Sequence, residues 1–80
     1  MKIILKLYAG LSQFLPENAE GNEAQIRVDP GSSLQEVIDS YGIPREYCYL
    51  VLVNGVYIPP DDREEYKLSE LDSLAVCRYA

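Results

Sequence analysis

Two apolar runs meet at an Asn-Gly pair in the second half of the chain, over residues 50–58. Asn54 and Gly55 tolerate the positive φ that both central residues of a two-residue type I′ turn require. The pattern therefore predicts a β-hairpin with residues 50–53 as its first strand. This strand is apolar throughout, without alternation, which is typical of a strand that is covered on both faces or lies centrally in its sheet.

Apolar residues at or near every second position predict three further strands, over residues 2–8, 25–29 and 74–79. The first two are joined by a short apolar helical turn over residues 11–15 and a polar loop over residues 17–23. We therefore expect the first two strands to pair with each other.

One amphipathic helix is predicted over residues 34–41. Ser33 and Glu36 have the spacing of a capping box, in which each side chain accepts a hydrogen bond from the backbone amide of the other residue. Gly42 suits the left-handed backbone at a helix end, and Pro44 prevents the helix from resuming. The apolar stripe consists of Leu34, Val37, Ile38 and Tyr41.

The order of elements is strand, strand, helix, strand, short strand, strand. A chain of 80 residues has room for one compact core, so residues 1–80 are expected to form a single domain. Because the helix crosses over after the second strand, the first and last strands should be parallel neighbours at the centre of a mixed sheet. This is an α+β fold of the β-grasp, or ubiquitin-like, class, with about five strands packed on one main helix.

The composition limits the classes of partner and location that we expect for this protein. The net charge of −6 repels phosphate backbones, so we expect no nucleic-acid partner, and a protein partner should be basic or apolar where it docks. No apolar run approaches the roughly 20 residues of a membrane span. Residues 1–6 have the pattern of a strand rather than a signal peptide, so the expected location is cytoplasmic.

The chain offers little for catalysis. It contains no His, and its two cysteines are too few for a four-thiolate cluster, so we expect no metal, no cofactor and no enzymatic activity of its own. Cys48 and Cys77 are expected to be reduced thiols that pack as small apolar side chains. The charged run 61–65 is interpreted as a solvated loop, with a docking patch as the alternative.

Several short segments in a fixed order, covering nearly the full length, resemble one family. They are Leu7–Leu11 (LYAGL), Phe14–Pro16 (FLP), Val28–Leu34 (VDPGSSL), Val37–Ile38 (VI), Gly42–Pro44 (GIP), Leu52–Gly55 (LVNG) and Leu71–Val76 (LDSLAV). These segments are similar to the MoaD/ThiS family of small ubiquitin-like sulfur carriers. The resemblance implies protein–protein docking with an adenylating enzyme or a synthase large subunit, in molybdopterin or thiamine biosynthesis.

Members of that family end in Gly-Gly, whose carboxylate is activated by ATP and converted to a thiocarboxylate. Here the sequence ends Arg78-Tyr79-Ala80, and alignment on the last strand leaves it about three residues, or roughly 10 Å of extended chain, short of the family pattern. The resemblance makes these residues the tail or docking candidates, and it implies that a carboxylate on Ala80 falls short of an enzyme-bound nucleotide. Two hypotheses follow: a carrier, or a non-carrier interaction module that keeps the docking sheet.

Overall fold

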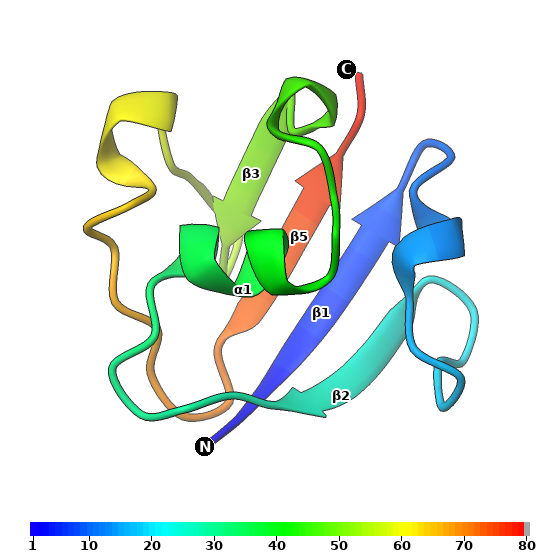
Figure 1. Ribbon diagram of the computed structural model, residues 1–80, viewed down its shortest axis with the longest axis horizontal. Coiled ribbons are helices and arrows are strands. Elements are labelled where there is room, and N and C mark those ends of the chain that lie inside the picture. The colour runs from blue at the N-terminus through cyan, green and yellow to red at the C-terminus, as the bar shows by residue number, and fades with distance from the viewer. Residues whose placement is uncertain (80) are drawn as a thin grey trace.

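The computed structural model describes residues 1–79. Its elements are β1 (Lys2–Tyr8), η1 (Ser12–Phe14), β2 (Glu23–Arg27), α1 (Leu34–Ser40), η2 (Arg45–Tyr47), β3 (Leu50–Val53), β4 (Val56–Tyr57), η3 (Pro60–Asp62) and β5 (Ser73–Cys77), where η marks a 3-10 turn. The strands form one 5-stranded sheet in the order β2-β1-β5-β3-β4 (Figure 1).

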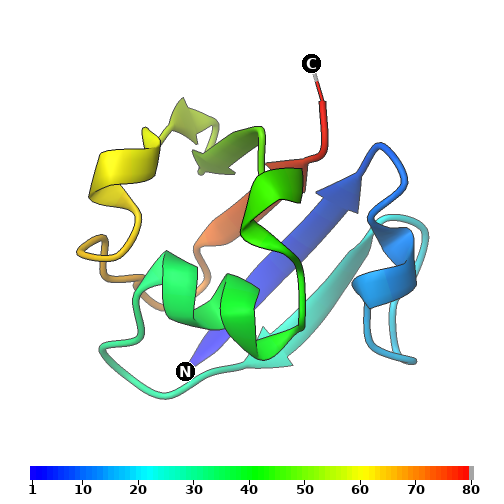
Figure 2. The same cartoon turned by 45° about the horizontal axis from the view of Figure 1, so that its top comes forward.

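The first and last strands lie side by side at the centre of the sheet. They are parallel, with Leu5 opposite Leu74 and Leu7 opposite Val76. All other pairings are antiparallel, so the sheet is mixed. The predicted β-grasp fold, with α1 packed on one face of five strands, is confirmed (Figures 1 and 2).

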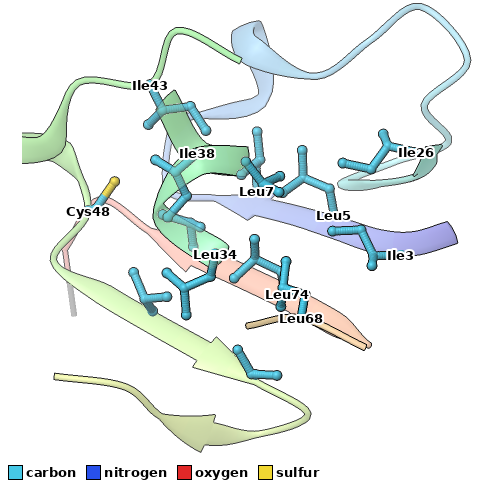
Figure 3. Close-up of a cluster of buried hydrophobic side chains, with 14 of the residues drawn as sticks. Ile3, Leu5, Leu7, Ile26, Leu34, Ile38, Ile43, Cys48, Leu68 and Leu74 are labelled. Atoms are coloured by element: carbon cyan, nitrogen blue, oxygen red, sulfur yellow. The ribbon is translucent and has the colours of Figure 1, made fainter. Parts of the chain in front are cut away.

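The core lies between α1 and the sheet face that it covers. Leu34 and Ile38 of the predicted stripe are completely buried, as are the inward-facing residues Ile3, Leu5 and Leu7 of β1 (Figure 3). The rest of the core is made of Leu11, Ala24, Ile26, Val37, Ile43, Cys48, Val51, Val53, Ile58, Leu68, Leu74 and Val76. Both cysteines are free thiols, Cys48 buried and Cys77 half-buried, as predicted.

The backbone amides at the start of α1 donate hydrogen bonds, both within the capping box and to a segment distant in sequence. The capping box is present, because the Ser33 amide donates to Glu36 Oε1 at 2.8 Å and the Glu36 amide donates to Ser33 Oγ at 3.1 Å. The Leu34 amide donates to the Tyr66 carbonyl at 2.9 Å, and the Gln35 amide donates to the carbonyl of Arg63 at 3.3 Å. Carbonyl groups of the segment after η3 therefore cap the N-terminus of α1.

Two predicted strands have different ends in the structure. β2 spans residues 23–27, two residues earlier at each end than the predicted range of 25–29. Its limits follow those of β1, because Glu23 pairs with Lys6 and Arg27 pairs with Lys2, the first residue of β1. β5 ends at Cys77 rather than at residue 79, because Leu50, its partner at that point, is the first residue of β3.

Of the two alternatives for residues 50–53, coverage on both faces is wrong, whereas an interior place in the sheet is confirmed, because β3 pairs with β5 on one side and with β4 on the other. Val51 and Val53 are buried, but Leu50 and Leu52 are only half-buried, and β3 lies next to the edge strand β4. The reason is that the main helix covers only one face of the sheet. The other face, called the open face below, exposes apolar side chains.

The prediction that residues 61–65 are a solvated loop fails at one residue. Arg63 is only 4% exposed, while the acids around it are exposed. Its Nε donates to the Ile58 carbonyl at 2.9 Å and its Nη1 donates to the Cys48 carbonyl at 2.8 Å. Arg63 is buried because its guanidinium joins the two ends of the β3–β4 hairpin.

Candidate functional site

The open face of the sheet carries a continuous apolar patch. Cross-strand neighbours have Cβ atoms about 4.5–5.5 Å apart, so residues in register form rows across the sheet. One row contains Tyr8, Cys77 and Leu50, and the next contains Lys6, Ala75, Leu52 and Tyr57. We call the apolar members of these two rows, which are Tyr8, Leu50, Leu52, Tyr57, Ala75 and Cys77, the sheet patch.

The sheet patch is accessible to a partner. Tyr57 is 47% exposed, Tyr8 is also exposed, and the other members are half-buried. Tyrosine suits an interface because its ring can be buried while its hydroxyl stays in water. Sequence reasoning missed this patch, because the unbroken run of apolar residues in β3 gave no indication of which ones would remain exposed.

The open face also carries basic residues. Lys2, Lys6 and Arg27 occupy its β1–β2 half, and within residues 1–79 none of them forms an ion pair. Lys6 is half-buried and lies opposite Glu23 on one side and Ala75 on the other. Among the strand residues of the open face, these three are thus basic and one, Glu23, is acidic, although the net charge of the chain is −6.

Acidic side chains gather on the helix side instead. Arg45 of η2 forms ion pairs with Asp39 of α1 at 2.9 Å and with Glu64 at 2.7 Å, which places these three segments together. The hydrogen bond from Arg45 holds the pKa of Asp39 below its ordinary value. Further exposed acids lie nearby in sequence, at Glu46, Asp61, Asp62 and Glu65. The charge of the protein is therefore unevenly distributed between its two sides.

The chain leaves the sheet at the edge of the sheet patch. Cys77, the last residue of β5, belongs to the patch, and Tyr79 is exposed beyond it. Arg78 does not join the patch, because its guanidinium carbon lies 3.8 Å from the ring centroid of Tyr47. Ala80, the third tail residue singled out from the sequence, lies outside the described residues. Tyr47 was missed, since nothing in the sequence connects it with Arg78.

Two further observations bear on the kind of site this can be. Within residues 1–79, no group of three or more His, Cys, Asp or Glu residues is arranged to hold a metal ion. In the same part of the chain, no helix has the length and apolar character needed to cross a membrane.

Comparison with known proteins agrees with this geometry. The sequence model of the family described as Mut7-C ubiquitin matches residues 1–77. The crystal structure of SAMP1 from Haloferax volcanii is similar, with a TM-score of 0.65 over 95% of this chain and 92% of that chain. Their sequences are 19% identical, so this likeness concerns the fold. No curated protein matches the chain significantly.

These matches agree with the MoaD/ThiS-type β-grasp expected from the short sequence segments. The family match covers all five strands and α1. The chain belongs to the Mut7-C ubiquitin family of ubiquitin-like proteins.

Proposed function

We propose that this protein is a ubiquitin-like docking protein of the cytoplasm, without catalytic activity of its own. Its sheet patch binds an adenylating enzyme or a synthase large subunit, and its C-terminal segment is presented beside that contact. The observation that supports this most directly is the position of Cys77, which is both a member of the sheet patch and the last residue of β5. A partner on the patch therefore lies next to the outgoing chain.

The chemistry of the open face defines the partner surface that would fit it. Covering half-exposed apolar side chains gains about 25 cal/mol per Å² of apolar surface removed from water. Lys6, in one row with Ala75 of the patch, and Lys2 and Arg27 further along the β1–β2 half favour acidic side chains on the partner, because like charges across an interface are costly. The fitting partner surface is thus apolar at its centre and acidic on one side. This differs from the basic or apolar surface expected from the net charge, because Lys2, Lys6 and Arg27 lie on the proposed docking face.

Two forms of this function remain. In the carrier form, a terminal carboxylate is adenylated by ATP and then converted to a thiocarboxylate for molybdopterin or thiamine biosynthesis. In the non-carrier form, the same face docks and the tail takes no part in chemistry. The contact between Arg78 and Tyr47 favours the non-carrier form, because it occupies a side chain that would otherwise be free to enter an enzyme channel.

Two substitutions in the same hairpin test the docking face. Leu52→Glu places a charge within the sheet patch, whereas Val56→Glu places the same charge at an exposed position of β4 outside the patch. With the adenylating enzyme of the source organism in isothermal titration, we expect Leu52→Glu to weaken binding about tenfold or more and Val56→Glu to leave it nearly unchanged. Equal binding by both variants, with both folded, would contradict the proposal.

The two forms are separated by intact mass. The chain is incubated with the adenylating enzyme, ATP and a sulfur donor. The carrier form predicts a mass gain of one oxygen-to-sulfur exchange at the terminal carboxylate. The non-carrier form predicts binding without any mass change.

A further inference from the structure

The contact between Arg78 and Tyr47 joins the outgoing chain to a turn far away in sequence. The distance of 3.8 Å from the guanidinium carbon to the ring centroid is well inside the range of a cation–π interaction. Both ribbon views place η2 beside the end of β5 (Figures 1 and 2). The stack thus ties the first residue after the sheet to the layer that contains α1.

The strand alternation explains why Arg78 reaches this side. Leu74 and Val76 of β5 point into the core, whereas Ala75 and Cys77 lie on the open face. Residue 78 therefore continues on the core side, just past the last core residue. Its side chain meets the ring of Tyr47 there and is directed away from the sheet patch.

Tyr47 is a fixed platform for this contact. Its ring is half-buried and packs against the hydrophobic core. Its amide donates to the Pro44 carbonyl at 3.0 Å, and the following amide of Cys48 donates to the Arg45 carbonyl at 3.0 Å. The backbone of η2 thus holds the ring in place before Arg78 stacks on it.

We propose that Arg78 and Tyr47 form a latch that fixes the direction in which the chain leaves β5. The two are positioning residues, because neither is required to touch a partner's reactive atoms. The latch keeps the residues after Cys77 from folding back across the sheet patch, so that the patch stays open for docking. It deepens the proposed function by giving the tail one starting direction, which reduces the ordering needed when a partner binds.

The latch can be measured in the isolated chain by NMR. In the wild type, the Arg78 side-chain protons should be shifted upfield by the ring current of Tyr47, and the Tyr79 amide should be ordered. In Tyr47→Leu, both signals should move towards those of a free tail. Tyr49→Leu is the matched control, because Tyr49 is exposed and lies two residues further along the chain.

Trypsin gives a second readout at the Arg78–Tyr79 bond, with a short Gly-Ser extension after Ala80 so that the protease can bind on both sides. Cleavage of a transiently open site follows the population of the open state, so Tyr47→Leu should raise this rate about two- to fivefold, the factor expected for an exposed cation–π contact. Cleavage after Arg27, on the far edge strand, reports any general loss of stability and is used to normalise the rate.

Wild-type chemical shifts of Arg78 equal to those of a free peptide would overturn the latch. An unchanged normalised cleavage rate in Tyr47→Leu would overturn it as well. Both readouts need no partner, so they fail or succeed independently of docking. Conversely, Leu52→Glu should weaken docking and leave the latch signals intact.

Discussion

Replacement of Arg63 is the most informative test of the fold, because within residues 1–79 no carboxylate pairs with this buried, charged side chain. Its guanidinium donates one hydrogen bond to the Ile58 carbonyl and one to that of Cys48. Hydrogen bonds from charged donors contribute about 1.5–3 kcal/mol each, so the two together contribute about 3–6 kcal/mol. Arg63→Met keeps most of the side-chain volume and removes both bonds.

An opposing effect makes the expected loss of stability in Arg63→Met smaller than the sum of the two hydrogen bonds. Within residues 1–79, the buried Nη2 of Arg63 has no hydrogen-bond partner, and burial of a charge with an unsatisfied donor is costly. Methionine removes that cost, so we expect a net loss of about 2–4 kcal/mol rather than the full sum. For a domain of this size each kcal/mol lowers the melting temperature by about 4–8 °C, so the midpoint should fall by about 8–32 °C.

The assay is thermal and urea denaturation followed by far-UV circular dichroism. Arg45→Met is the matched control, because it also removes one arginine but breaks only exposed ion pairs, which contribute little. Arg63→Lys should also be destabilised, since one ammonium group lacks the planar fork that reaches both carbonyls. If Arg63→Met melts within about 2 °C of Arg45→Met, the hairpin does not depend on these hydrogen bonds.

Three further predictions concern the helix, a turn and pH. Ile38→Asp buries an unpaired carboxylate in the core and should leave the chain unfolded, with no dispersed amide signals in NMR. Leu71 has a left-handed backbone with φ of 66° and an exposed side chain, so Leu71→Gly should raise stability by about 0.5–1 kcal/mol; a lower melting temperature would show that its side chain has a packing role. The pKa of Asp39 is lowered by Arg45 and that of Glu36 by the Ser33 amide, so the unfolded chain binds more protons than the folded one in acid. The stability from these groups should be complete above their ordinary values of 3.8 and 4.5 and should be lost as the pH falls through the lowered ones. Urea midpoints from pH 7 to pH 3 should therefore fall less steeply for Asp39→Asn than for the wild type.

Local sequence signals predicted the features that depend on neighbouring residues. Asn54 and Gly55 both adopt the positive φ expected of the hairpin turn, at 51° and 82°. Ser33 and Glu36 form the predicted capping box. Such features are determined within a few residues, so the sequence alone was sufficient. The parallel pairing of β1 with β5 was also predicted, because a crossover helix and two apolar end strands leave few ways to bury one hydrophobic face.

The tertiary structure alone decided which residues are left for function. The sequence could not tell that Leu50 and Leu52 would be half-exposed, because this depends on which sheet face α1 covers. It could not place Arg63 in the interior or Arg78 on Tyr47, since each of these contacts joins residues at least five positions apart across different elements. Hydrophobic periodicity determined the architecture of this protein, whereas packing between distant segments determined its exposed patch, its buried arginine and the direction of its tail.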